Sequence, residues 1–550
     1  MKSQLFYKTI VMLSFAALAF PSCTRLDQHV YSVVPNGNFW QTPEEIAAGI
    51  APAYQALTAI PDGSVFNISE VSSDECIVPT RGSDWYDGGE WQQLWLHTWT
   101  AQSGQLNNAW NDIYNGIGKI NFALSQVDSL PEPPENLAGI DAELKTLRAY
   151  YYFLAMDLFG NVPLVTSFNT DPNSVTNVPR ADVFDFIEKE LKDNLDLLPV
   201  DVSGSTYGRV TKWMAFALLG KLYLNAQVYT GKARWADCMA MCDSIIESAG
   251  YTLMADYFDN FSTDNEKSTE NIFVVPFDRI NISGNGWEMN TLHYQNNVNF
   301  GLSGSPYNGF CTAAAFYYSF DTTSVYSATG ANTYRTFKDQ RTGQYLVGQQ
   351  YSAPYPYPPY QNILVGTSDP GITALSDLQT QLPLKFTPDV DVLSNPSGAF
   401  RLAGVRNIKY FPESGTAGQQ SNDMVLFRLS DIMLMRAECA LRLGTDLSGA
   451  LDLVNQIRER AYSGDNSHDW KMADLTLDNI LAERGRELAW EGWRRNDLIR
   501  YEVAGGKPYY GATRVPGKKA DPSDRHLNIF AIPAPQISAN PKLKQNPGYN

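Results

Sequence analysis

Two segments that lie far apart in the sequence, 216–249 and 431–461, repeat one pattern of apolar and small residues. Each begins with a stretch whose apolar positions recur every three or four residues, which is the period of one helical face. A glycine then interrupts each stretch, Gly231 in the first segment and Gly444 in the second, and another amphipathic stretch follows. Because glycine readily adopts the left-handed conformation that ends many helices, the pattern predicts two helix–turn–helix units.

Small residues occupy the positions where the helices of each unit would cross. Gly220 stands there in the first unit, and Ala437 and Ala450 flank the turn of the second. Small side chains allow helix backbones to approach closely, as tetratricopeptide-like pairs require in order to stack. We therefore expect a mainly α fold, built on a scaffold of tetratricopeptide-like helical pairs.

Helical periodicity covers both ends of the chain but not its middle. Between 255 and 423 it gives way to Gly, Ser, Asn, Pro and Tyr, a composition typical of loops and short strands carried on a scaffold. That segment lacks the apolar runs that a core of its own would need. We therefore expect one domain over 43–550, with a helical scaffold at 43–254 and 424–550 and a loop-rich cap at 255–423. The predicted helices span 43–58, 106–128, 141–159, 181–198, 210–229, 233–249, 424–443, 447–461 and 476–500.

The first residues have the pattern of an export signal. Lys2 and Lys8 are followed by an apolar run, Ile10–Phe20, which is shorter than the roughly 20 residues that span a bilayer. The sequence FPSC then places Cys23 directly after a small residue, as in a bacterial lipobox. We predict a signal peptide over 1–22.

An acylated Cys23 would anchor the protein in a membrane through its lipid chains. The residues that follow it, up to position 42, have little periodicity and are expected to form a tether. The alternative is an ordinary signal peptide with an incidental cysteine.

Charge and cysteine content exclude several classes of protein. A net charge of −17 argues against nucleic acid as a partner, because phosphates require a basic surface. Of the six cysteines, the five after Cys23 are an odd number and form no disulfide framework. Cys238 and Cys242 are one helical turn apart, but neither histidine nor further cysteine lies nearby to complete a metal site, so buried side chains are favoured. We predict neither a metal nor a cofactor.

Four blocks in the predicted helical regions carry a more specific pattern. They are LRAYYYFLAMDLFGNVPLV (147–165), LFRLSDIMLMRAECAL (426–441), ILAERGRELAWEGWRRNDLIR (480–500) and IFAIPAPQISANPKLKQNPGYN (529–550). Together with the lipobox, these blocks resemble the SusD/RagB family of outer-membrane nutrient-binding lipoproteins. The resemblance covers both ends of the chain and most of the helical regions, whereas the middle third contains no assignable motif.

The resemblance implies a noncatalytic lipoprotein on the outer face of an outer membrane. Such a protein captures oligosaccharides or polysaccharides and delivers them to a SusC-like TonB-dependent transporter. A RagB-like protein that binds peptides and works with the same class of transporter is the alternative.

The tryptophans of 79–100 fall into two groups. Trp91, Trp95 and Trp99 recur every four residues, which favours packing of one helical face into a core. Trp85 instead lies in GSDWYDGG, which has neither helical nor strand period, so we expect its ring to be exposed on one face. An exposed indole or phenol can hold the apolar face of a sugar, while polar groups at its rim bind the hydroxyls. The predicted ligand-binding residues are Asp74, Arg81, Trp85, Asp87, Trp287, Tyr307 and Asn308.

Glu483, Glu487 and Glu491 follow one another at intervals of four, which places them on a single helical stripe. A glycosidase uses two carboxyl groups roughly 5 to 9.5 Å apart, a separation that such glutamates can reach. The abundance of arginine nearby favours ion pairing over catalysis. The expected partners are Arg484, Arg486, Arg494 and Arg495.

Overall fold

The computed structural model describes residues 39–40, 42–130, 133–282, 284–390, 398–505, 509–510 and 525–549. The chain divides into two compact units, Met1–Ala47 and Ala48–Asn550. The predicted signal peptide and Cys23 lie outside the described residues. The second unit contains all the sites considered below.

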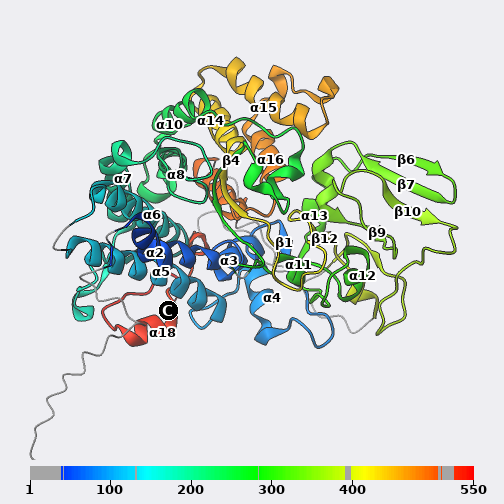
Figure 1. Ribbon diagram of the computed structural model, residues 1–550, viewed down its shortest axis with the longest axis horizontal. Coiled ribbons are helices and arrows are strands. Elements are labelled where there is room, and N and C mark those ends of the chain that lie inside the picture. Colours follow the sequence, from blue (N-terminus) through cyan, green and yellow to red (C-terminus); the bar gives the residue numbers. More distant parts are fainter. Residues whose placement is uncertain are drawn as a thin grey trace, which may run out of the picture. The chain divides into compact units, whose positions relative to one another are not determined.

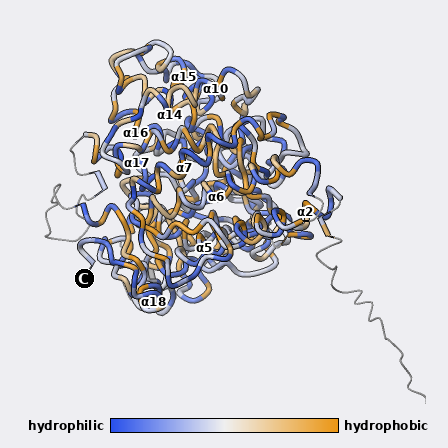
Figure 2. Tube along the Cα trace, turned by 90° about the vertical axis from the view of Figure 1, so that its left-hand side faces the viewer, coloured by the Kyte–Doolittle hydropathy of each residue, from blue (hydrophilic) through white to orange (hydrophobic). Residues whose placement is uncertain are grey.

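Helices form the two ends of the chain (Figure 1). They are α2 (Pro43–Gln55), α3 (Ser64–Val71), α4 (Glu90–Trp95), α5 (Gly104–Asp128), α6 (Leu137–Phe159), α7 (Arg180–Asn194), α8 (Lys212–Leu224), α9 (Ala226–Thr230), α10 (Trp235–Ser248), α14 (Leu429–Leu443), α15 (Leu447–Ala461), α16 (Leu477–Glu487), α17 (Arg494–Gly505) and α18 (Ala534–Ala539). Apolar and polar residues alternate along them, as expected for helices that bury one face (Figure 2). Among the described residues, none of the helices combines the length and apolar character needed to cross a membrane.

The two predicted helix–turn–helix units pack against each other. Helix α8 packs on α10, α10 on α14, and α14 on α15, so the units stack although they are far apart in sequence. Gly220 lies at this junction, where a Cβ atom would be 3.5 Å from Met435 and 3.7 Å from Cys242. Cys238 and Cys242 are buried, as expected, with 4.0 Å between their Sγ atoms. The expected tetratricopeptide-like scaffold is confirmed.

Three of the helix predictions are wrong in their boundaries. The predicted helix over 210–229 is two helices, α8 and α9, which are separated at Asn225. The segment 424–428 is a strand, β13 (Met424–Arg428), because it pairs with β4 (Asn271–Val275) before α14 begins. The predicted helix over 476–500 is two helices, α16 and α17. The connection between them contains Trp490 and Gly492, which have φ angles of 59° and 81° and so lie in the left-handed region. A continuous helix cannot pass through such residues.

The segment 255–423 consists of short strands and helical turns. Strand β7 (Asn332–Phe337) lies between β6 (Ser324–Thr329) and β10 (Ile363–Thr367) in an antiparallel sheet. Its other short elements are β5 (Cys311–Thr312), β8 (Tyr345–Leu346), β9 (Gly348–Gln349), β11 (Lys385–Phe386), β12 (Arg406–Asn407), α11 (Trp287–Thr291), α12 (Asn297–Phe300) and α13 (Ala314–Tyr317). The scaffold contributes three short strands, β1 (Cys76–Ile77), β2 (Val162–Pro163) and β3 (Asn177–Val178). The two-stranded sheets are β8–β12 and β9–β11 in this segment, β2–β3 in the scaffold, and β1–β5 and β4–β13 between the two.

This segment has an apolar core, contrary to expectation. Single apolar residues from its loops and short strands meet there, so no apolar run marks the core in the sequence. Its buried members are Leu292, Phe300, Leu302, Leu346, Leu384, Phe386, Leu402 and Ile408.

Candidate functional site

The loop that carries Trp85 is a tight, irregular turn. The amide of Arg81 donates to the carbonyl of Asp84, and the amide of Asp84 donates back, at 2.9 and 3.3 Å. Trp85 itself adopts a left-handed conformation with φ of 61°, between Gly82 and Gly88, which are also left-handed. This backbone turns the indole out of the path of the chain, and the ring is half-buried.

The Trp85 ring rests on a second segment of the chain, 307–310. Its Nε1 donates a hydrogen bond of 2.7 Å to the carbonyl oxygen of Tyr307, and Phe310 meets the ring edge-to-face at 5.7 Å. Gly309 lies directly against the indole, since a Cβ atom there would be 2.3 Å from a ring carbon. Two segments predicted separately, around Trp85 and around Tyr307, are thus in contact.

Exposed and half-buried rings surround this contact. Tyr307 and Tyr86 have exposed fractions of 51% and 55%. The hydroxyl of Tyr294 donates to Asp84, and the Arg401 guanidinium lies 4.7 Å from the centre of the Tyr294 ring. Burial and the neighbouring Asp84 carboxylate raise the pKa of Tyr294 to about 12, so the phenol stays protonated.

We call the set of Trp85, Tyr86, Tyr294, Tyr307 and Arg401 the Trp85 surface. It combines aromatic rings with hydrogen-bonding groups, the combination that sugars require. Tyr294 and Arg401 were not predicted, because neither their residue types nor their neighbours in sequence distinguish them from many similar residues.

Arg81 and Asn308 lie beneath this surface and are fully buried. Arg81 donates to the carbonyls of Phe400 and Arg401 at 2.9 and 3.2 Å. Asn308 donates to the Arg401 carbonyl at 3.0 Å and accepts from the guanidinium of Arg406 at 2.7 Å. In this structure both side chains are buried and hold the backbone around Arg401, so neither is exposed to a ligand. Their contact with a ligand stays a prediction.

Asp74 and Asp87 also have internal partners. The Asp74 carboxylate accepts two hydrogen bonds from Arg494, at 2.7 and 2.9 Å, and so links β1 to α17 rather than joining the Trp85 surface. Asp87 is exposed on the Trp85 loop and accepts a bond of 2.7 Å from Nε1 of Trp91. Both aspartates stay predicted ligand residues, since Asp87 is exposed and the side chain of Asp74 is 41% exposed beside Arg494.

Trp287 is an interior residue. The expectation of a ring on an exposed loop is wrong, because Trp287 begins helix α11 and is only 3% exposed. Its ring packs against Phe66, Tyr410 and Trp490 at centroid distances of 5.1 to 5.6 Å. Of the tryptophans at intervals of four, Trp91 and Trp99 are buried as expected, although α4 ends at Trp95.

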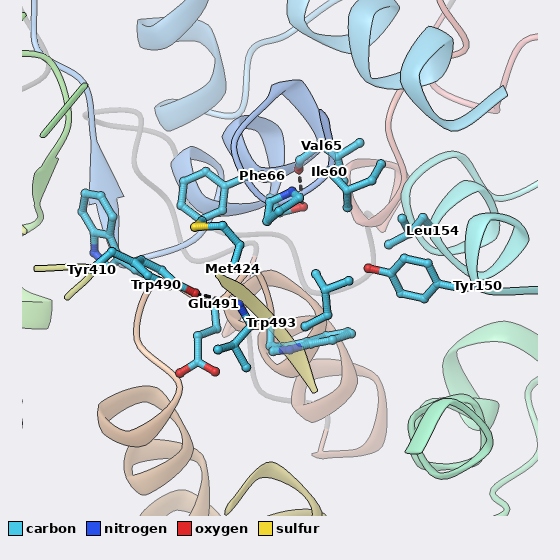
Figure 3. A pocket seen from close by; sticks show the side chains of 15 residues that line it. Ile60, Val65, Phe66, Tyr150, Leu154, Tyr410, Met424, Trp490, Glu491 and Trp493 are labelled. Atoms are coloured by element: carbon cyan, nitrogen blue, oxygen red, sulfur yellow. Dashed lines mark hydrogen bonds between the residues drawn. The ribbon is translucent and has the colours of Figure 1, made fainter. Parts of the chain in front are cut away.

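A small cavity lies beside this aromatic core, lined by Phe66, Tyr150, Tyr410, Trp490 and Trp493 among others (Figure 3). Its volume is about 50 Å³. Since a single water requires roughly 10 to 15 Å³ on this measure, the cavity has room for a few waters. It is too small for a sugar ring, so we do not assign it as a ligand site.

The glutamate stripe is an interior charge network. Glu483 pairs with Arg341 at 2.8 Å and with Arg458 at 2.9 Å, and Glu487 pairs with Arg428 at 2.6 Å. Burial opposes ionisation of Glu483 and Glu487, but the surrounding guanidiniums hold the pKa of both carboxyls well below the usual range. Neither group can act as a general acid near neutral pH.

Most of the ion pairs predicted for these glutamates are wrong. Only Arg486 pairs with the stripe, through Glu483. The others bind aspartates, because their side chains leave α16 and α17 in other directions: Arg484 binds Asp431 and Asp497, Arg494 binds Asp74, and Arg495 binds Asp157.

Comparison with known proteins identifies the family. The model of the SusD family matches residues 269–549, which is more than half of the chain. The chain belongs to the SusD family. A second model, described as "Starch-binding associating with outer membrane", matches residues 32–224.

Members of the SusD family resemble the chain over most of its length. The starch-binding protein SusD of Bacteroides thetaiotaomicron is 24% identical over 509 residues, which are 88% of this chain and 85% of the relative. The structure of surface glycan-binding protein A from Bacteroides fluxus has a TM-score of 0.68 at 19% identity, and covers 92% of this chain and 100% of its own. Protein A from Bacteroides thetaiotaomicron, in complex with laminarihexaose, has a TM-score of 0.66 at 19% identity, with coverages of 92% and 99%. The chain therefore shares the SusD fold.

Proposed function

We propose that this protein is a noncatalytic glycan-binding lipoprotein of the cell surface, which captures oligosaccharides on the Trp85 surface. The contact between Trp85 and Tyr307 carries the proposal. It fixes an indole that is packed on one side against Gly309 and Phe310, with the exposed rings of Tyr86 and Tyr307 beside it.

The chemistry of the rim supports a sugar ligand. The apolar face of a pyranose packs on an indole or phenol, and its hydroxyls then need donors and acceptors at the edge of the ring. Asp84, Arg401 and the Tyr294 hydroxyl supply both kinds of group. A shallow site of this kind binds with a Kd between roughly millimolar and micromolar, or about 4 to 8 kcal/mol.

Relatives suggest which glycans to test first. One relative is named as a starch-binding protein, and one solved structure of the same fold holds laminarihexaose. We infer that the ligand of this chain is a glucan or a similar pyranose chain. Peptide identified by mass spectrometry in material that copurifies with the protein would instead favour the RagB-like alternative.

Membrane attachment and delivery to a transporter complete the proposal. A lipid on Cys23 would tether the protein to the outer membrane, facing outward, where it would pass glycans to a SusC-like TonB-dependent transporter. Labelled palmitate should be incorporated into the parent but not into a Cys23→Ala variant. Copurification of a TonB-dependent transporter from detergent-solubilised membranes tests the partner.

The decisive experiment is titration of the purified protein with a panel that includes starch oligosaccharides and laminarihexaose. We expect Trp85→Ala to weaken binding at least tenfold. Trp235→Ala, which removes a half-buried indole from α10, should not change the affinity. If Trp85→Ala binds every glycan of the panel as tightly as the parent does, the Trp85 surface is not the ligand site.

A further inference from the structure

Three neighbouring hollows lie where α15 ends, and the second of them is bounded by β6 and β7. Their volumes are about 670, 380 and 590 Å³. The first two share Tyr360 and Ser463, and the second and third share Tyr462 and His468. Because they share these lining residues, the hollows adjoin one another. We call the three hollows together the His468 groove, and define it by Tyr360, Tyr462, Ser463, His468 and Trp470.

The groove is separate from the Trp85 surface. Helix α15 lies at the top of the view in Figure 1, whereas α4, whose Trp91 contacts Trp85, lies near the bottom. No residue lines both places among those that the structure describes.

A stacked pair of rings forms the ridge of the groove. The rings of Tyr462 and His468 are parallel to within 7°, with 3.8 Å between their centres. This stacking covers one face of the His468 ring, while 26% of its side chain remains exposed. Trp470 adds a half-buried indole to the wall of the third hollow.

The loop that carries these rings is held rigidly. Trp470 donates through its amide to Asn455 at 2.8 Å, and its carbonyl accepts from the same side chain at 3.1 Å. Arg458 donates twice to the carbonyl of His468, at 2.9 and 2.7 Å, and its guanidinium lies 5.3 Å from the Trp470 ring centre. A ligand would therefore find the rings already in place, which reduces the entropic cost of binding.

Two polar atoms in the walls have no partner among the described residues. They are Nε of Arg460, in the first hollow, and Oδ1 of Asp469, in the third, and both atoms are buried. Arg460 is itself more than nine-tenths buried. Because both atoms are buried, neither is open to solvent in the groove, and the exposed uncharged polar side chains of its second hollow are Gln361, Asn362 and Ser463.

We propose that the His468 groove is a second binding site, for a neutral oligosaccharide. Aromatic faces would hold the apolar sides of the sugar rings, and exposed polar side chains such as Gln361, Asn362 and Ser463 would bind hydroxyls. Charges of both signs line the third hollow, with Asp321, Asp469 and Asp474 opposed by Arg458 and Arg486, so an anionic ligand is not favoured and no single sign of charge dominates. The choice of a sugar rests on the proposed function, whereas the groove itself does not.

Two sites on one molecule would change how it binds a polymer. Once one site holds a polysaccharide chain, the other meets a high local concentration of the same ligand, which raises overall affinity by roughly 10²- to 10⁴-fold when geometry allows both contacts. A short oligosaccharide would not show this gain.

The experiment measures retardation of the full-length protein in native gels that contain soluble starch or laminarin. The proteins compared are the parent, Trp85→Ala, Trp470→Ala and the double variant. Trp235→Ala is the matched control, because its indole also has an arginine, Arg442, at 5.3 Å. His468→Ala serves as a second probe of the groove if Trp470→Ala melts at a lower temperature than the parent.

We expect each single variant to weaken polymer binding at least tenfold, the double variant to abolish it, and Trp235→Ala to behave as the parent does. If the two groove variants are retarded like the parent while Trp85→Ala is not retarded at all, the second site is overturned and the proposed function stands. If Trp85→Ala is retarded like the parent while the groove variants lose binding, the groove is supported and the Trp85 surface is overturned. A parent that neither polymer retards overturns both.

Discussion

The indole of Trp85 and the backbone of Tyr307 are joined by a hydrogen bond of 2.7 Å. This bond ties a loop that follows β1 to the segment that precedes β5, and these two strands pair with each other. The Trp85 surface is therefore attached to two strands that pair with each other, and it does not move freely as a surface loop would. Substitutions of residues that pack against this contact should therefore weaken ligand binding even when the substituted residue does not touch the ligand.

Gly309→Ala tests that support. The added methyl group would meet the Trp85 ring at 2.3 Å, so the ring must shift. We expect glycan affinity to fall about tenfold, equivalent to ~1.4 kcal/mol, while the far-UV circular dichroism stays unchanged. Gly118→Ala is the matched control, because nothing lies within 4 Å of a Cβ atom there. An affinity for Gly309→Ala equal to that of the parent would show that the position of the ring is unimportant.

Arg81→Met separates positioning from ligand contact. The change leaves the carbonyl of Phe400 without its side-chain donor, and an unsatisfied buried group costs about 1 to 3 kcal/mol. The carbonyl of Arg401 keeps its bonds from Asn308 and Arg406. We expect a lower melting temperature together with weaker glycan binding. Trp85→Ala should weaken binding with a smaller loss of stability. If Arg81→Met binds poorly yet unfolds at the same denaturant concentration as the parent, Arg81 contacts the ligand directly.

Glu487→Gln tests the interior charge network. Glu487 pairs with Arg341 and Arg428, and all three side chains are fully buried. Removing one partner of a buried ion pair leaves an uncompensated charge, which costs about 3 to 5 kcal/mol. Asp193→Asn provides the contrast, because its partner Lys189 is exposed and exposed pairs contribute only about 0 to 1 kcal/mol. In chemical denaturation, Glu487→Gln should lose more free energy of unfolding than Asp193→Asn does. Equal losses in the two variants would contradict the assignment of Glu487 to a buried charge network.

The dependence of stability on pH should reveal Glu70. Burial raises the pKa of Glu70 to about 7, and burial together with Glu70 raises the pKa of Glu75 above its usual value. The unfolded chain loses the Glu70 proton near its ordinary pKa of about 4.5, before the folded chain does. The free energy of unfolding should therefore fall as the pH rises from about 4.5 to 7, by roughly 1 to 3 kcal/mol.

Glu70→Gln should reduce this slope, because the amide has no proton to lose in that range and its oxygen can still accept from Gly492. Part of the slope should remain, because burial also raises the pKa of Glu288 to about 7. Denaturant midpoints measured at intervals across that pH range provide the test. Glu459→Gln, at an exposed position, is the control and should keep the slope of the parent. A slope in Glu70→Gln equal to that of the parent would assign the whole effect to other carboxyl groups.

The sequence predicted the scaffold well because helical periodicity is a local signal. The positions of α5, α10 and α15 follow from their apolar spacing. Segment 424–428 was wrongly predicted as helix. Its apolar residues form a strand, β13, because they pair with β4, which is far away in the sequence. Pairing with a distant strand leaves no mark in local periodicity.

The candidate site was predictable in part. Trp85 and Tyr307 stood out because glycine-rich, polar sequence surrounds each ring. Trp287 has similar neighbours, yet it is buried, since the amide of Gly286 bonds to Asp62 and brings the following helix over Phe66. Tyr294 and Arg401 acquire their role only through contacts between distant segments, which composition cannot reveal.

The network around Arg341 and Arg428 crosses the division between the cap and the scaffold. Arg341 comes from the cap and binds Glu483 and Glu487 of α16, while Lys409 from the cap pairs with Glu491. Unfolding of either the cap or the scaffold alone would leave several buried charges of the other part without their partners. The two parts should consequently melt together, in one calorimetric transition whose measured enthalpy equals the van't Hoff enthalpy.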